Sequence, residues 1–196
     1  MNAVQLAVKR LFDIVVSVFG MILLLPVYII IYCLLKRETA ESAIFSQERI
    51  GKDGVPFMIY KFRTITEAPD AEPTLRAEVD DSVSSSLQKT LRRYHLDELP
   101  QLWNVLKGDM SFVGPRPERQ YFIDKIKERS GDYNLVLEMR PGITSEASIY
   151  NGYTDTVEKM LKRMELDIRY LQNRTLWLDF TIVLDTIYSI AFSKNQ

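Results

Sequence analysis

One long apolar run dominates the hydropathy pattern near the N-terminus. Residues 11–35 are almost wholly apolar, and four basic residues flank them: Lys9, Arg10, Lys36 and Arg37. The run exceeds the roughly 20 residues that a membrane helix needs, and it is too long for a cleavable signal peptide. A straight single-span anchor is the plain interpretation of such a segment.

Two features of the run argue against a straight span. Lys and Arg prefer the cytoplasmic side of a membrane, and here they stand at both ends. Pro26 lies inside the run, where it removes a backbone donor and predicts a kink. The two arms, roughly 15 and 10 residues long, are each too short to cross about 30 Å of hydrocarbon. We therefore expect residues 9–37 to form a re-entrant helix hairpin with both ends cytoplasmic and the basic pairs at lipid headgroups.

Beyond the apolar run, shorter patterns alternate. Residues 43–49 and 55–65 predict a β-hairpin with its turn at 52–54. Residues 67–86 are acidic and rich in Ser, Pro and Ala, which is typical of a solvated loop or a lid. Helical spacing of apolar positions predicts helices over 97–107, 118–129 and 154–172. Gly108 ends the first of these helices, and the second is mostly charged on its surface.

The last apolar segment, residues 176–192, carries Asp179 and Asp185. Two acids make a membrane span costly, so the segment is either a core helix or an amphipathic helix in the membrane interface. Together the patterns predict an α+β fold that is mainly helical, with a re-entrant membrane hairpin, a small β-hairpin, and amphipathic interfacial and core helices.

The net charge and the cysteine content of the chain bear on its partners and its compartment. The chain has 196 residues and a formal charge of −1, so no global basic field indicates nucleic acid as a partner. Its single cysteine, Cys33, cannot form an intramolecular disulfide and lies in the apolar run, which fits a reducing compartment.

The strongest chemical signal is the acidic pair Asp97 and Glu98. Acids at a helix start are often only caps. Here Arg92 and Arg93 precede the pair, and Arg116 follows it between two prolines that restrain the backbone. Two acids, restrained arginines and a helix start suit a metal-bound phosphate ester, and a carboxylate there can act as a nucleophile toward phosphorus.

One long segment and several short ones form a family pattern. The long segment is LDELPQLWNVLKGDMS at 96–111. The short segments are KRLFD at 9–13, QERIG at 47–51, IYKFRT at 59–64, VGPRP at 113–117, RPGIT at 140–144 and ELD at 165–167. In this order, and over nearly the whole chain, they resemble the bacterial sugar transferases, the monotopic membrane phosphoglycosyl transferases.

The resemblance implies a magnesium-dependent ping-pong reaction. A sugar-1-phosphate passes from a UDP-sugar to polyprenyl (undecaprenyl) phosphate, and UMP is released. The transfer proceeds through a covalent aspartyl phosphosugar intermediate. It is the first membrane step of surface glycan assembly. Asp97 matches the nucleophile and Glu98 its acidic partner. The two acids are expected to hold Mg²⁺, with assistance of proton transfer as the alternative role for Glu98. The residues that match substrate-binding positions are Lys61, Arg116, Arg140 and Asp167.

The resemblance also implies a location. We expect residues 1–40 to form the re-entrant membrane helix with its basic flanks, and residues 41–196 to form a catalytic domain packed on the cytoplasmic face of the bacterial inner membrane. By comparison with larger relatives, we expect no multi-span domain ahead of this unit. The sequence specifies neither the sugar nor the oligomeric state.

Three departures from the family pattern stand out. Leu25-Pro26 replaces a common Ser-Pro, so the membrane helix is expected to bend less sharply. Residues 145–153 differ from the usual continuation of the RPGIT segment, which leaves the preference for sugar or nucleotide open. His95 stands where a small polar residue is usual, and we expect it to pack rather than act as a base.

Two other functions fit the residues. A non-catalytic membrane adaptor would use the basic flanks to bind anionic lipid. A metal-dependent phosphohydrolase would use the acidic pair and water, although the sequence offers no further His or Asp cluster of the two-metal type.

Overall fold

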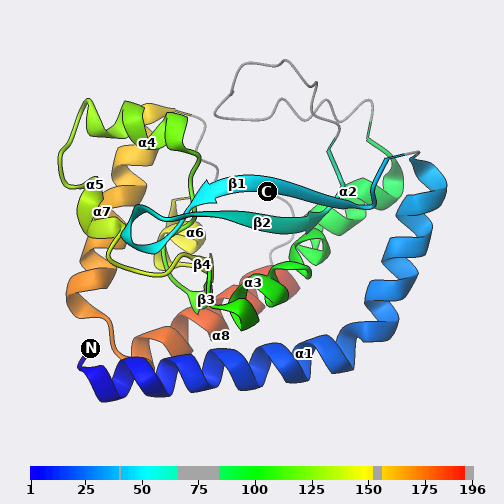
Figure 1. The fold of residues 1–196 in the computed structure, drawn as a ribbon, viewed down its shortest axis with the longest axis horizontal. Coiled ribbons are helices and arrows are strands. Elements are labelled where there is room, and N and C mark those ends of the chain that lie inside the picture. The colour runs from blue at the N-terminus through cyan, green and yellow to red at the C-terminus, as the bar shows by residue number, and fades with distance from the viewer. Residues whose placement is uncertain (40, 66–83, 152–155, 193–196) are drawn as a thin grey trace.

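The computed structural model describes residues 1–39, 41–65, 84–151 and 156–192 (Figure 1). Within these ranges the chain is mainly helical and has two small sheets, so the α+β class predicted from the sequence is confirmed. The loop or lid expected at 67–86 falls almost wholly outside the described residues.

Helix α1 (Ala3–Glu38) is one continuous helix with Pro26 inside it. Figure 1 shows it running beneath the rest of the chain and then bending upward along one side. Among the described residues it is the one helix long and apolar enough to cross a membrane, and most of its apolar surface is exposed. The bend agrees with a proline that removes one backbone donor and clashes with the preceding turn.

The predicted β-hairpin is confirmed. Strands β1 (Ile44–Ile50) and β2 (Pro56–Phe62) pair antiparallel, and the short 3₁₀ helix η1 (Lys52–Gly54) connects them. Asp53 and Gly54 both have positive φ, of 58° and 75°, a conformation that glycine adopts without steric cost and that aspartate tolerates in turns.

The predicted helix at 97–107 is present in two pieces. A 3₁₀ turn, η2 (Leu96–Glu98), leads into α3 (Gln101–Lys107), and Gly108 at φ 100° ends the helix with a left-handed cap. Before this run lies α2 (Ser86–Arg93), which the sequence did not reveal.

The remaining elements surround a short parallel bridge. They are β3 (Ser111–Val113), α4 (Gln120–Lys127), α5 (Tyr133–Val136), β4 (Gly142–Thr144), α6 (Glu146–Tyr150), α7 (Val157–Asn173) and α8 (Leu176–Phe192). Strands β3 and β4 pair in parallel over three residues each. The charged residues of α4 are exposed as expected, while one face of the helix is buried through Phe122, Ile123 and Ile126.

Several small clusters, rather than one centre, hold the fold. The second arm of α1 buries Ile31 and Leu35 against Ala43, Phe62 and Leu91. A second cluster joins the end of β1 to α4, α5 and α7, and a third joins β2 to α3. The β-hairpin therefore reaches from α1 to α7, and its strand β2 packs against α3.

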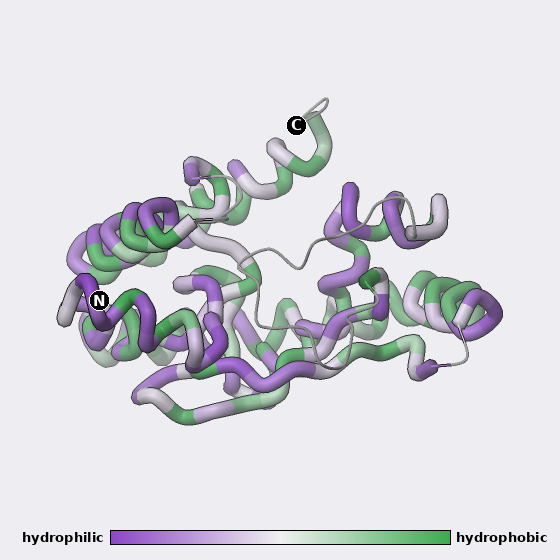
Figure 2. The backbone as a smooth tube through the Cα atoms, turned by 90° about the horizontal axis from the view of Figure 1, so that it is seen from above, coloured by the Kyte–Doolittle hydropathy of each residue, from purple (hydrophilic) through white to green (hydrophobic). Residues whose placement is uncertain are grey.

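Helix α8 has one buried and one exposed side. Asp179 and Ile182 are buried, while Trp177, Phe180 and Tyr188 are exposed. Figure 2 shows the last turns of α8 projecting from the rest of the chain. The start of the helix therefore packs in the core, and its other side is apolar and uncovered. The interfacial alternative stays a prediction.

Candidate active site

The acidic pair lies where η2 enters α3. His95 precedes the turn in a left-handed conformation (φ 52°), and its carbonyl oxygen accepts from the backbone N–H of Glu98. Asp97 points to the buried side of this helical run, whereas Glu98 is only partly buried. The ring of His95 is exposed, so the packing role expected for it is not observed.

Glu98 forms the ionic centre of the site. Lys61 Nζ on β2 lies 2.6 Å from Glu98 Oε1, and Arg116 Nη1 lies 4.0 Å from the same oxygen. Burial would raise the pKa of Glu98, but the two cations outweigh burial and lower it to about 2. Glu98 is therefore a carboxylate at any physiological pH.

Asp97 is the more basic of the two acids. Its side chain is buried, and its Oδ1 atom has no hydrogen-bond partner within the described residues. Burial raises the pKa of Asp97, and the Glu98 carboxylate raises it further, to about 6, although Lys61 acts in the opposite direction. A desolvated carboxylate that is mostly ionised at neutral pH has the properties of a nucleophile.

Lys61 owes its position to a buried asparagine. The Asn104 side chain of α3 donates to the carbonyl oxygen of Met58 at 2.7 Å and accepts from the backbone N–H of Tyr60 at 3.1 Å. Asn104 thereby takes the place of a neighbouring strand along the free edge of β2. This attachment sets the register of the hairpin on α3 and brings Lys61 over Glu98.

Arg116 is held from both sides of its Pro-Arg-Pro segment. On one side, a Cβ at Gly114 would lie 2.3 Å from the carbonyl oxygen of Arg140, so only glycine permits this backbone approach. On the other side, Glu118 is buried and pairs with Arg163 at 3.1 Å and Arg49 at 3.7 Å. The guanidinium of Arg116 itself remains partly exposed, as a substrate-binding group requires.

Asp167 belongs to the buried network behind Arg116. It lies on α7 one turn after Arg163, and its side chain is 4% exposed. Burial raises the pKa of Asp167 to about 7, with Glu118 and Glu146 adding to the shift and Arg163 opposing it. No hydrogen bond or ion pair found in the described chain joins Asp167 directly to Asp97 or Glu98.

Arg140 lies at the other end of α3. Its Nε atom donates to the carbonyl oxygen of Gly108 at 3.0 Å, and its side chain is exposed. The structure thus brings together Asp97, Glu98, Lys61 and Arg116, and leaves Arg140 apart from this group.

The basic residues at the start of α1 have protein partners. Lys9 forms a 2.6 Å ion pair with Asp179 of α8 and donates to the carbonyl oxygen of Val113 at 3.0 Å. Arg10 donates to the carbonyl oxygens of Val105 and Leu106 at 2.6 and 2.8 Å. Hence this pair links α1 to helix α3 and to α8.

The basic residues at the other end of α1 are exposed. Lys36 donates to the carbonyl oxygen of Glu41 at 3.1 Å, and Arg37 lies on the surface beside it. Both remain in a position that a lipid headgroup could reach.

Sequence reasoning missed the polar stripe by which α1 meets the domain. Asp13 is buried and accepts from Ser111 Oγ and the backbone N–H of Phe112, both at 3.1 Å, and Ser17 is fully buried. Arg10, Asp13 and Ser17 follow one another at intervals of three and four residues, so they share one face of a mostly apolar helix. That spacing was the available signal, because lipid would not accept such a stripe without partners.

The sequence profile of the bacterial sugar transferase family matches residues 4–193. The chain belongs to this family. It is 37% identical, over all of its own length, to a UDP-glucose:undecaprenyl-phosphate glucose-1-phosphate transferase of Klebsiella pneumoniae. Over 95% of its length it is 38% identical to a protein of the same name from Caulobacter vibrioides.

A third relative carries a different name. It is a UDP-N-acetylgalactosamine-undecaprenyl-phosphate N-acetylgalactosaminephosphotransferase of Aeromonas hydrophila, 36% identical over 93% of the chain. The chain spans 42% of the Klebsiella protein, 43% of the Aeromonas protein and 71% of the Caulobacter protein. It therefore corresponds to only part of the longer relatives.

The donor set of this bacterial sugar transferase limits how it can hold a metal. The described residues contain no group of three or more His, Cys, Asp or Glu side chains that could form a metal cage. Mg²⁺ is often bound by one or two carboxylates together with substrate phosphates. Asp97, whose Oδ1 is unpaired, and the adjacent Glu98 fit that second mode.

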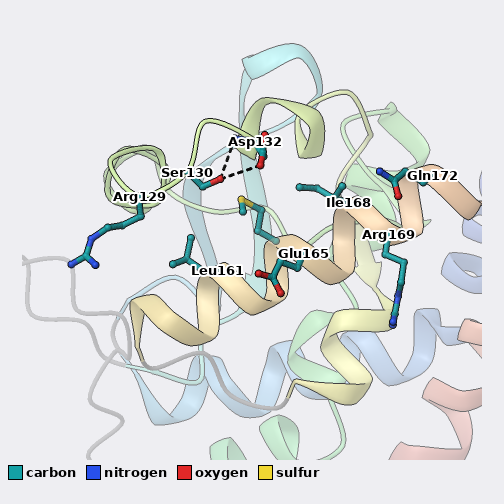
Figure 3. A pocket seen from close by; sticks show the side chains of 9 residues that line it. Arg129, Ser130, Asp132, Leu161, Glu165, Ile168, Arg169 and Gln172 are labelled. Carbon is teal, nitrogen blue, oxygen red and sulfur yellow. Dashed lines mark hydrogen bonds between the residues drawn. The ribbon is translucent and has the colours of Figure 1, made fainter.

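A separate hollow of about 590 Å³ lies along α7 (Figure 3). Leu161 and Ile168 line it together with Arg129 and Arg169. None of the predicted site residues lines this hollow. The candidate site is therefore the ionic group around Glu98 and not this hollow.

Proposed function

We propose that the protein transfers a sugar-1-phosphate from a UDP-sugar to undecaprenyl phosphate and releases UMP. The observation that carries the proposal is the contact of Lys61 and Arg116 with an acidic pair that contains a buried, unpaired carboxylate. The names of the relatives support the substrate classes, since they act on UDP-sugars and undecaprenyl phosphate.

Asp97 is the proposed nucleophile. Its carboxylate oxygen attacks the β-phosphorus of the UDP-sugar, the bond from that phosphorus to the bridging oxygen breaks, and UMP leaves with that oxygen. The aspartyl phosphosugar is then attacked by a phosphate oxygen of undecaprenyl phosphate, which frees Asp97 and yields the lipid diphosphate sugar. Burial supports this role, because a desolvated carboxylate of pKa about 6 is ionised at pH 7 and more basic than an exposed aspartate.

The cations around Glu98 would stabilise the phosphoryl group during both steps. Arg116 is partly exposed and restrained by its prolines, which suits bidentate binding of phosphate oxygens. Lys61 would hold Glu98 ionised and contribute a second positive charge. When bound by Asp97 and Glu98, Mg²⁺ would supply charge neutralisation for the diphosphate.

Arg140 and Asp167 take more distant roles in the proposal. Arg140 lies at the end of α3 with an exposed guanidinium that could meet another part of a substrate. Asp167 lies behind Arg163, in the network that positions the Arg116 segment, and would act on substrate binding through it.

The proposed setting is the cytoplasmic face of the bacterial inner membrane. The bend of α1 at a proline-containing stretch and its exposed apolar surface support a re-entrant insertion. The exposed aromatic side of α8 supports contact with the membrane interface, where Trp and Tyr are favoured. A soluble UDP-sugar and a lipid phosphate could then meet at Asp97.

The decisive experiment measures UMP release. Purified protein, undecaprenyl phosphate and Mg²⁺ are combined with a panel of UDP-sugars, beginning with UDP-glucose and UDP-N-acetylgalactosamine. Asp97→Asn should abolish turnover and the covalent phosphosugar adduct seen by mass spectrometry. Asp124→Asn, the same exchange on the exposed side of α4, is the control and should retain both.

Three outcomes would contradict the proposal. If folded wild-type protein releases no UMP from any UDP-sugar, the remaining hypothesis is the lipid-binding adaptor. Release of free sugar phosphate without a lipid acceptor would favour the phosphohydrolase. An active Asp97→Asn variant would assign the nucleophile elsewhere.

A further inference from the structure

Within the described residues, two buried polar atoms of the η2–α3 run have no hydrogen-bond partner. Gln101 is 2% exposed, and its Nε2 donor has no hydrogen-bond partner within the described residues. The other atom is Oδ1 of Asp97, four residues earlier in the chain. An unpaired buried donor is costly, so most such groups in folded proteins have a partner. A ligand that supplies a hydrogen-bond acceptor would satisfy the Gln101 amide.

Position supports this interpretation. Residues four apart on a helix are neighbours, which places Gln101 beside Asp97 on the buried side of the run. The next buried amide on that side, Asn104, is fully engaged with β2 and so has a structural role. Within the part of the chain that the structure describes, the Gln101 amide nitrogen has no such partner, although Gln101 belongs to the same helix and is also buried.

The chemistry of the site defines the missing acceptor. Lys61 and Arg116 make the surroundings of Glu98 cationic, and they would attract an anion that brings several oxygen atoms. A phosphoryl group that approaches Asp97 presents such oxygens toward the buried side. An amide donor fixed beside the reacting atom can stabilise the charge that develops on those oxygens.

We propose that the Gln101 side-chain amide donates a hydrogen bond to a non-bridging oxygen of the phosphoryl group that Asp97 receives. Gln101 is then a third phosphate-binding group, after Arg116 and Lys61, and the one that acts from the buried side. The identity of the substrate in this assignment rests on the proposed function. The chemical class of the acceptor, a phosphate oxygen, is inferred from the unpaired amide.

Gln101→Met tests the assignment, because methionine keeps the length of the side chain and removes the donor. Loss of an unpaired buried donor should leave the thermal midpoint unchanged or raise it, whereas loss of a structural amide would lower it. Turnover should fall about 100-fold, as for removal of one donor from an oxyanion site. Gln120→Met is the matched control, since Gln120 is exposed on α4, and it should keep wild-type turnover.

Binding of inorganic phosphate separates this inference from the proposed function. In the presence of a chelator, phosphate should raise the thermal midpoint of the wild-type protein, and Gln101→Met should weaken phosphate binding about 10-fold, the effect of losing one charge-assisted hydrogen bond. Gln101→Leu, of similar volume, provides the same test if the methionine variant does not fold.

The outcomes are distinguishable. A Gln101 variant that binds phosphate and turns over as the wild type does would overturn the assignment, as would a wild-type protein that phosphate does not stabilise. Phosphate binding that depends on Gln101, in a protein that releases no UMP from any UDP-sugar, would support the donor role and reject the transferase.

Discussion

Lys61 on β2 and Glu98 in the η2 turn form a 2.6 Å ion pair that joins the β-hairpin to the turn before α3. The pair lies beside Asp97, whose pKa it influences from both sides, since Glu98 raises it and Lys61 lowers it. One contact thus links the fold of the hairpin to the ionisation of the proposed nucleophile.

Lys61→Met should therefore change both the rate and its pH dependence. Without the lysine, turnover should fall about 100-fold. Because Lys61 lowers the pKa of Asp97, its loss should raise that pKa. The acid limb of the kcat/KM profile, which we expect near pH 6 for the wild type, should then move to higher pH. Lys52→Met, which removes an exposed ion pair at the hairpin turn, should change neither. An unmoved acid limb would separate Lys61 from the titration of Asp97.

Arg10→Ala should destabilise the protein at the junction of α1 and α3. Arg10 donates to two carbonyl oxygens in the last turn of α3, where a cation is also favoured by the helix dipole. Loss of these contacts should cost about 2 kcal/mol. The thermal midpoint in detergent measures the effect, with Arg37→Ala as the exposed control on the same helix. Equal midpoints for the two variants would contradict a structural role for Arg10.

Gly114→Ala should be poorly tolerated. The new Cβ would lie 2.3 Å from the carbonyl oxygen of Arg140 and 3.0 Å from the backbone nitrogen of Gly142, and backbone atoms cannot move aside as a flexible side chain can. We expect a loss of about 3 kcal/mol or more, together with a raised KM as the Arg116 segment shifts. Gly131→Ala, where a Cβ meets nothing within 4 Å, is the control. A wild-type midpoint for Gly114→Ala would show that the β3–β4 bridge can relax.

Asp167 should make stability depend on pH. Its pKa of about 7 in the folded protein exceeds the ordinary value of 3.8, so the folded state holds the proton more tightly. Its contribution to stability is therefore complete below about pH 4 and declines as the pH rises through about 7. Asp167→Asn should remove this decline and stabilise the protein above pH 7 by on the order of 2–4 kcal/mol.

Thermal unfolding from about pH 5 to about pH 8 measures this effect. Asp124→Asn, which changes an exposed acid, should leave the pH dependence as it is in the wild type. A pH slope that survives in Asp167→Asn would assign the titration to another group.

Elements with a clear period were predictable from the sequence. The alternation around Phe57 and Ile59 predicted the hairpin, and the spacing of Met160 and Met164 predicted α7, because these side chains must face a core. The bridge between β3 and β4 was not predictable in the same way. Each strand has three residues, too few to show a period, and the pairing depends on a close approach at Gly114.

The site was predictable in its residue types and only partly in its contacts. Family motifs pointed to Asp97, Glu98, Lys61 and Arg116, which the fold brings together. They did not show that Asn104 holds the hairpin in register. Such contacts depend on tertiary geometry, which spacing along the chain does not encode.

The contacts of α1 with α3 and β3 offer a route by which a surrounding bilayer would affect the acidic pair. Arg10 and Asp13 tie this helix to the backbone of α3 and β3, so a change in its tilt would be transmitted to the acidic pair. Membrane helices adjust their tilt to the thickness of the hydrocarbon layer. If α1 inserts into the membrane as proposed, turnover is expected to vary with bilayer thickness, and an unrelated hydrophobic anchor of the same length should not substitute for α1.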